Sequence, residues 1–148
     1  MLDIEVRDMT VNDIDKVMEI ENLCFKAPWP KKDVLIELND NKLAVLMVIT
    51  INNEVVGFCD YWNTFDSGTI CQIAIQPNYQ HQSLGSMLLK EVIKDAQAKK
   101  TRILTLEARA TNVNAISFYK KHGFKISLVK ENYYSNGEDA IYMMKEVC

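Results

Sequence analysis

The sequence predicts a mixed α/β (α+β) domain. A central seven-stranded mixed sheet would be flanked by four helices, in the order β-α-α-β-β-β-α-β-α-β-β. Seven short segments alternate in polarity or are rich in β-branched residues, and four others repeat apolar residues every three or four positions. Turn and helix-capping residues separate these segments. A chain of 148 residues, 48% of them hydrophobic, fits one domain over residues 1–148 with a single sizeable core.

The N-terminal part predicts one strand and two helices. Residues 4–7 alternate like a strand, and Thr10 then offers a helix N-cap with the carboxylate of Asp13 three residues later. A helix follows to about residue 24. Its apolar face is spaced by three and four residues: Ile14, Val17, Ile20 and Cys24. Residues 30–39 predict a short second helix, with a proline in the first turn, where it is tolerated.

The next part predicts a three-stranded meander. Residues 43–51 are apolar and β-branched, and the Asn-Asn pair at 52–53 is a turn signal before a strand over 55–62. Residues 69–75 form the third strand after a Gly-containing turn. The period then changes, because apolar residues recur every four positions: Leu84, Leu88, Val92 and Ala96. We therefore expect an amphipathic helix from residue 84 to about residue 100.

The C-terminal part predicts a strand, a helix and a hairpin. Residues 103–108 are a strand, and residues 114–122 form a helix closed by Gly123, the residue type favoured just past a helix end. Residues 124–132 and 140–145 alternate and are expected to pair as a hairpin. Its turn is predicted at Asn136 and Gly137, because an Asn-Gly pair favours a tight hairpin turn.

Composition excludes several classes of function. A net charge of −3 argues against general nucleic-acid binding, which usually needs a basic face. No charged leader precedes an apolar stretch and no segment is long enough to span a membrane, so we expect a cytoplasmic protein without membrane binding. The cysteines have neither zinc-ligand nor disulfide-scaffold spacing, and the chain has only two histidines, so we expect no metal. These residues are Cys24, Cys59, Cys71, Cys148, His81 and His122.

The order of elements predicts a crevice. A strand, a turn, a helix and a further strand make the strands over 69–75 and 103–108 parallel neighbours with a right-handed crossover. Ligands of open sheets bind where the carboxyl ends of such strands meet. The polar turn at 76–83 lies at the end of one strand, and Glu107 lies on the other. A helix N-terminus can hold an anion, so this crevice suits a phosphate-bearing acyl donor beside a base.

Three sequence blocks, together with "APWP" at 27–30, carry a resemblance that covers nearly the whole chain. They are "QHQSLG" at 80–85, "LEARATNVNAISFYKKHGF" at 106–124 and "ENYYSNGEDAIYMMK" at 131–145. In this order they resemble the GCN5-related N-acetyltransferase (GNAT) family and, within it, the RimI-type N-alpha-acetyltransferases. The resemblance implies the GNAT fold, acetyl-CoA as co-substrate and no metal.

The resemblance also implies roles for individual residues. The strand before the loop would pair with the pantetheine arm of the cofactor through Ile73, Ala74 and Ile75. The loop amides would bind the pyrophosphate, from residues His81, Gln82, Ser83, Leu84, Gly85 and Ser86. Asn112 matches the family asparagine near the cofactor arm. Glu107 matches the proposed base and Tyr119 the acid that protonates the departing thiolate. Three aromatic residues are candidates for a peptide groove: Trp29, Tyr133 and Tyr134.

One position departs from the family motif. The first glycine of the loop is Ser83 here, and the commonly basic positions are His81 and Ser86. If position 83 needs a positive φ, a side chain costs roughly 1–2 kcal/mol. If the backbone at position 83 must approach the cofactor closely, the Cβ of Ser83 occupies part of that space, although its hydroxyl can also bond phosphate. Gly85 is expected either to allow close approach or to adopt a positive φ.

Structural readings stand beside these functional ones. Taken alone, Glu107 reads as a solvated or ion-paired surface residue and Tyr119 as a core aromatic with a satisfied hydroxyl. The three groove candidates read equally well as core or edge-strand aromatics.

At the level of function, the resemblance implies acetylation of a free protein N-terminus, with the N-terminal alanine of a small-subunit ribosomal protein as the implied acceptor. Two alternatives remain open: an acetyltransferase acting on lysine or a small amine, and a non-catalytic acyl-CoA-binding domain.

Overall fold

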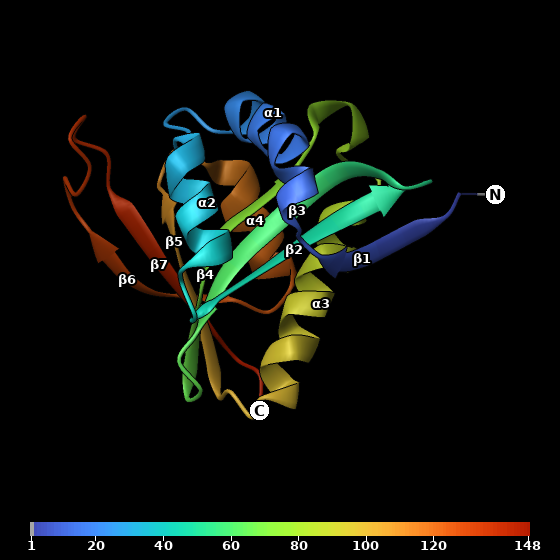
Figure 1. The fold of residues 1–148 in the computed structure, drawn as a ribbon. Coiled ribbons are helices and arrows are strands. Elements are labelled where there is room, and N and C mark those ends of the chain that lie inside the picture. The colour runs from blue at the N-terminus through green and yellow to red at the C-terminus, as the bar shows by residue number, and fades with distance from the viewer. Residues whose placement is uncertain (1) are drawn as a thin grey trace.

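The computed structural model describes residues 2–148 and contains one seven-stranded sheet in the order β1-β2-β3-β4-β5-β7-β6 (Figure 1). The strands are β1 Ile4–Asp8, β2 Ala44–Ile51, β3 Glu54–Asn63, β4 Ser67–Ile75, β5 Ile103–Arg109, β6 Lys125–Lys130 and β7 Ala140–Glu146. The helices are α1 Ile14–Cys24, α2 Lys31–Asn39, α3 Leu84–Ala98 and α4 Val113–Lys121, with 3₁₀ turns at Val11–Asp13 and Pro77–Tyr79. The predicted fold class and order of elements are confirmed.

Helices cover both faces of the sheet, so the sheet divides the core into two layers rather than the single core expected from the sequence. Strand β2 shows why: Leu46 and Val48 pack with α1 and α2, whereas Met47 and Ile49 pack with α3. Because both faces are covered, this strand is apolar at every central position instead of alternating. In Figure 1, α1 and α2 lie in front of the sheet. None of the helices within residues 2–148 combines the length and the apolar character needed to cross a membrane.

The only parallel pair of the sheet opens before its strands end. Ser67–Ile70 of β4 pairs with Ile103–Leu106 of β5, as the crossover predicts, but the pairing stops there. On its other side, β4 carries a register shift opposite Asp60 and Tyr61, which leaves Cys71 as an extra residue. Beyond that point β4 stays with β3 and β5 stays with β7, so their facing edges separate and leave a gap.

The C-terminal hairpin is paired as predicted, but its connection is longer. Strand β6 ends at Lys130 and β7 begins at Ala140, so residues 131–139 form a loop instead of extending the strands. The predicted turn lies inside this loop, where Gly137 has a φ of +87°. Gly123, with a φ of +90°, closes α4 as expected.

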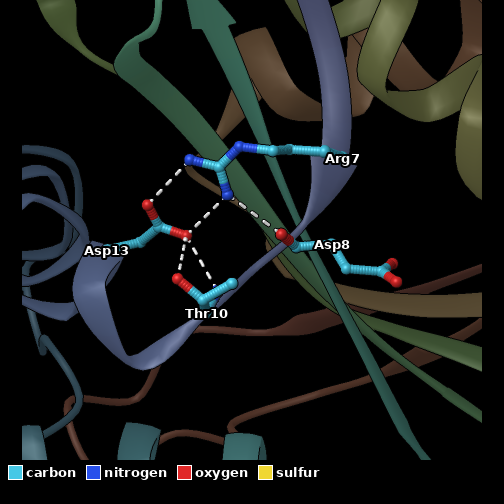
Figure 2. A network of polar contacts seen from close by, with 4 residues as sticks. All are labelled: Arg7, Asp8, Thr10 and Asp13. Atoms are coloured by element: carbon cyan, nitrogen blue, oxygen red, sulfur yellow. Dashed lines mark hydrogen bonds and ion pairs between the residues drawn. The ribbon is translucent and has the colours of Figure 1, made fainter.

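A polar network joins β1 to the start of α1 (Figure 2). The two terminal guanidinium nitrogens of Arg7 donate to the carboxylate of Asp13, at 2.8 and 2.9 Å. The backbone N–H of Thr10 donates to the same carboxylate at 2.8 Å. The Thr10 hydroxyl also lies 3.3 Å from Asp13 Oδ2. Thr10 is the N-cap of the 3₁₀ turn that leads into α1, and Asp13 completes a capping box with it, as the sequence predicts. The hydrogen bonds from Arg7, followed by those from Thr10, outweigh burial and lower the pKa of Asp13.

We expect Asp13→Asn to lower the free energy of unfolding by about 1–3 kcal/mol at pH 7, because a buried carboxylate loses hydrogen bonds from a charged partner. Urea denaturation measures this difference. Since the folded pKa of Asp13 lies below its unfolded value of about 3.9, its contribution is present above that pH. The contribution is lost as the pH falls further, through the folded pKa. The difference between the two proteins should therefore shrink in acid below about pH 4.

Asp15→Asn is the matched control, because the Asp15 side chain is 96% exposed and pairs only with Lys31 at 3.3 Å. We expect it to change the stability by less than about 0.5 kcal/mol. An equal loss in both variants would show that the network does not hold this corner.

Candidate active site

Two adjoining cavities open where β4 and β5 separate. The first, about 520 Å³, lies between the end of β4, the turn into α3 and the helix α4. The second, about 450 Å³, lies between residues 24–29, the gap between the strands, and Tyr134. Three residues line both cavities: Ile73, Ala115 and Tyr119. The two cavities therefore share a wall at the gap.

The turn into α3 presents backbone N–H groups at the first cavity. The first helical hydrogen bond runs from Met87 N to Ser83 O, so the amides of Leu84, Gly85 and Ser86 have no acceptor within the helix. Such amides at the positive end of a helix suit an anion. Five of the six predicted loop residues line this cavity, namely His81, Ser83, Leu84, Gly85 and Ser86, whereas Gln82 is exposed and lies off its wall.

Ser83 has a left-handed backbone, with a φ of +65° and a ψ of 11°. His81 has the same φ, so the turn contains two left-handed residues with side chains. This explains the usual glycine at position 83, since a side chain in this region costs roughly 1–2 kcal/mol. Gly85 lies in the helix, and the alternative that it needs a positive φ is wrong. A Cβ there would lie 3.4 Å from Phe118, so Gly85 keeps the cavity open at the start of α3.

The end of β4 aims backbone amides into the gap. Gln76 N donates to Val56 O at 2.8 Å. Since hydrogen-bonded residues alternate along antiparallel strands, every second residue of β4, counted back from Gln76, bonds to β3. The backbone groups of Ile73 and Ile75 therefore face away from β3. The carbonyl of Ile75 agrees with this direction, because it accepts a hydrogen bond from Gln80 Nε2 at 3.0 Å.

Ala74 faces the opposite way. Its side chain is buried with the residues of α1, and its backbone pairs with Phe58 of β3. Side chains alternate along a strand, so Ile73 and Ile75 line the first cavity and Ala74 does not. Of the three residues predicted to contact the cofactor arm on this strand, the structure thus directs two toward the cavity.

Glu107 lies on the wall of the second cavity with Tyr134. The Tyr134 hydroxyl donates to Glu107 Oε1 at 2.6 Å, and the guanidinium carbon of Arg109 lies 4.0 Å from the centre of the Tyr134 ring. Burial, and then the hydrogen bond to Glu107, raise the pKa of Tyr134, so its hydroxyl keeps the proton that it donates. Glu107 is exposed at the cavity, but Tyr134 holds its carboxylate in place, in contrast to a freely solvated surface residue.

Tyr119 belongs both to the core and to the site. It is 8% exposed, and its ring packs edge-on against Phe118 and Phe124, at centroid distances of 5.2 and 5.4 Å. The Tyr119 hydroxyl is not among the fully buried polar atoms that lack a hydrogen-bond partner within residues 2–148. Burial raises the pKa of this hydroxyl, so it stays protonated at neutral pH. The reading as a core aromatic is therefore right about packing.

The remaining predicted residues have mixed placements. Asn112 lines the second cavity and caps α4, since its Oδ1 accepts from Ala115 N at 3.3 Å. Trp29 lines the same cavity. Tyr133 is 48% exposed and lies off the cavity wall, with its ring edge-on to Tyr134 at 5.2 Å. The structure therefore brings two of the three groove candidates to the site.

Sequence reasoning missed two supporting residues. His122 Nε2 and Ser86 Oγ share a hydrogen bond of 2.8 Å, which ties the end of α4 to the first turn of α3. Burial, followed by nearby lysines, lowers the pKa of His122. Glu21 is fully buried and accepts from Gln72 Nε2 at 2.9 Å and from Trp29 N at 3.2 Å, so it supports the wall of the second cavity. A glutamate beside the apolar face of a predicted helix was the only sequence signal for Glu21.

Comparisons with known proteins find similar sequences and a similar fold. The model of the acetyltransferase (GNAT) family matches residues 14–124. A protein of Bacillus subtilis (strain 168), provisionally named a [ribosomal protein bS18]-alanine N-acetyltransferase, is 40% identical over 93% of this chain and 92% of its own. The [ribosomal protein bS18]-alanine N-acetyltransferase of Escherichia coli (strain K12) is 30% identical over 93% and 94%. The crystal structure of the Escherichia coli ribosomal-protein-S18-alanine N-acetyltransferase superposes with a TM-score of 0.89 and 28% identity, covering 98% of this chain and 94% of that one.

We expect Ser83→Gly to raise the free energy of unfolding by about 1 kcal/mol, because glycine removes the cost of the left-handed backbone. The start of α3 fixes this conformation through the bond from Met87, so the gain should appear in fold stability. The dissociation constant for acetyl-CoA should then change by less than about threefold, or under 1 kcal/mol. Urea denaturation and titration calorimetry measure the two quantities.

Weaker binding of acetyl-CoA by about 1–2 kcal/mol, together with unchanged stability, would instead assign the Ser83 hydroxyl to a phosphate contact. Gly85→Val is the companion variant, because its larger side chain would meet Phe118 at the cavity wall. If folded Gly85→Val bound acetyl-CoA like the parent, the turn would not be the anion site.

Proposed function

The chain belongs to the acetyltransferase (GNAT) family and is an acetyl-CoA-dependent N-acetyltransferase, and we propose that its acceptor is the free N-terminal amine of a protein. The proposed substrate is the N-terminal alanine of ribosomal protein bS18. We propose that the reaction takes place in the cytoplasm and that residues 1–148 form the one domain that catalyses it. The names of the relatives from Bacillus subtilis and Escherichia coli support this acceptor.

The observation that carries the proposal is the pair of cavities joined through the gap between β4 and β5. The first cavity fits the donor, since it combines the unbonded amides of Leu84, Gly85 and Ser86 with the open position of Gly85. Acetyl-CoA supplies a thioester-activated acetyl group there. The second cavity carries Glu107 and Tyr134 and would receive the amine from the other face.

The residues at the junction match the proton transfers of the reaction. An amine loses a proton when it attacks a thioester, and the sulfur gains one as it leaves. We propose that Glu107 accepts the first proton, directly or through a water, from an α-amine whose pKa is about 7.7–8.0. Tyr119, on the wall of both cavities, keeps its proton at neutral pH and is the proposed donor to the sulfur.

Backbone groups would complete the site. The N–H of Ile73 faces the gap and is the proposed partner of the thioester carbonyl, an interaction that often contributes about 3–4 kcal/mol. The choice of an α-amine over a lysine side chain also has a physical reason. A lysine amine has a pKa near 10.4 and is harder for a carboxylate to deprotonate.

We expect Glu107→Gln to slow turnover by about 10²- to 10⁴-fold at saturating substrates, because the amide keeps the shape of the carboxylate without its basicity. Tyr119→Phe should also reduce turnover while acetyl-CoA still binds. Steady-state kinetics and titration calorimetry separate the two quantities. The matched controls are Glu146→Gln, on the exposed end of β7, and Tyr133→Phe, off the cavity wall.

If Tyr119→Phe lowered the free energy of unfolding but left the turnover rate unchanged, Tyr119 would have only a packing role. Full activity of Glu107→Gln would mean that another group or bulk water takes the proton.

The acceptor is tested with peptides that begin with the N-terminal alanine of bS18 and contain an internal lysine. We expect mass spectrometry to place the new acetyl group on the α-amine, and prior acetylation of that amine to abolish the reaction. Comparable rates on internal lysines or on polyamines would reverse the assignment and favour an acetyltransferase for lysine or a small amine.

A further inference from the structure

A second cluster of reactive side chains lies under α2, apart from the acetyl-transfer residues. It contains Glu37 of α2, Asp60 of β3 and Cys71, the extra residue where β4 shifts register. One oxygen of each carboxylate and the sulfur all lie within 4.8 Å of one another. Three elements far apart in the sequence therefore place three potential metal ligands at one point.

Asp60 is the residue that the fold leaves unexplained. It is 2% exposed, and within residues 2–148 neither of its oxygens accepts a hydrogen bond. Burying a carboxylate without partners is costly, so a proton or a cation must compensate. A proton shared with Glu37 accounts for one oxygen of Asp60 and leaves the other without a partner.

The surroundings of Glu37 resemble the outer shell of a metal ligand. Its Oε1 accepts from Trp62 Nε1 at 2.5 Å, and its Oε2 accepts from Asn41 Nδ2 at 2.7 Å. Hydrogen bonds of this kind orient a ligating carboxylate. Among the residues that the structure describes, Cys71 has no comparable partner, and its sulfur makes a weak contact of 3.8 Å with Thr69 O.

The cluster can also be reached from solvent. Cys71 lies on the wall of the second cavity, and Glu37 lies on a third one of about 250 Å³ beside Trp29 and Trp62. A metal site needs suitable ligands, supporting hydrogen bonds and an entry path, and this cluster has all three.

We propose that Cys71 Sγ and the carboxylates of Asp60 and Glu37 form a site for a divalent transition metal, with Zn²⁺ as the expected ion. Thiolate and carboxylate oxygen are both zinc ligands, and three protein ligands leave a fourth tetrahedral position for water. Binding displaces the thiol proton of Cys71 and the carboxyl proton of Asp60 into solvent, and no electrons are transferred. The bound ion would give Asp60 a partner and would link α2, through Glu37, to Cys71 in β4.

This site supplies no step of the acetyl transfer proposed above. Cys71 and its neighbour Gln72 line the second cavity, so the metal would stiffen the wall on which the acceptor is proposed to bind. The proposal does not depend on the identity of that acceptor.

The test is a titration of the full chain, first stripped of metal with a chelator, by Co²⁺ as a spectroscopic substitute for Zn²⁺. We expect a single equivalent to produce a thiolate-to-Co²⁺ charge-transfer band, and Zn²⁺ to abolish it by displacement. Cys71→Ser should remove the band, and Asp60→Asn should weaken binding by at least about tenfold. Circular dichroism confirms that each variant is folded.

Two serine variants serve as controls. Cys24→Ser changes a thiol on the same cavity but outside the cluster, and Cys148→Ser changes an exposed one. Both should keep the band. If the wild-type chain gives no band, or if folded Cys71→Ser keeps it, the proposal fails. Should Asp60→Asn not fold, the wild-type titration and Cys71→Ser still decide the question.

Discussion

The end of pairing between β4 and β5 at Ile70 and Leu106 is the constraint on which the rest of the site depends. Each strand stays bonded to its outer neighbour, β4 to β3 and β5 to β7, while the inner edges separate. Such a gap exposes backbone groups that a continuous sheet would pair. Both cavities meet at this gap. The sheet loses hydrogen bonds where the strands separate, but the freed backbone groups become available to ligands.

The gap also explains how residues from opposite faces reach one site. Along β5, Leu106 and Ala108 pack toward α3 and α4, so Glu107 points to the other face. Tyr119 comes from α4, on the face of Leu106. In an unbroken sheet these two side chains would be separated by backbone. Here Tyr119 lines both cavities, so the proposed acid on one face and the proposed base on the other can serve the same acetyl transfer.

Polar groups beneath α1 and α2 support the wall of the second cavity. Glu21 joins α1, the loop at Trp29 and Gln72 of β4 through two hydrogen bonds, although its burial raises its pKa. Glu37 of α2 and Asp60 of β3 lie close to each other on the same side of the sheet. Buried carboxyls are costly unless they are paired, protonated or bound to a cation. These buried carboxyls lie close together beside the second cavity. The hydrogen bonds of Glu21 therefore hold residues of its wall in position, in addition to the apolar packing there.

The sequence by itself determined the elements and their order. Periodicity, the Asn-Asn turn and Gly123 are local signals, and the order of elements predicted a crevice flanked by the turn into α3 and by Glu107. Only the tertiary structure decided that Ala74 faces away, that Tyr133 lies off the wall and that residues 131–139 form a loop. It alone revealed the contact of Ser86 with His122 and the cluster at Asp60. These features depend on strand register and on contacts between segments far apart in the chain, and no local pattern of residues encodes either.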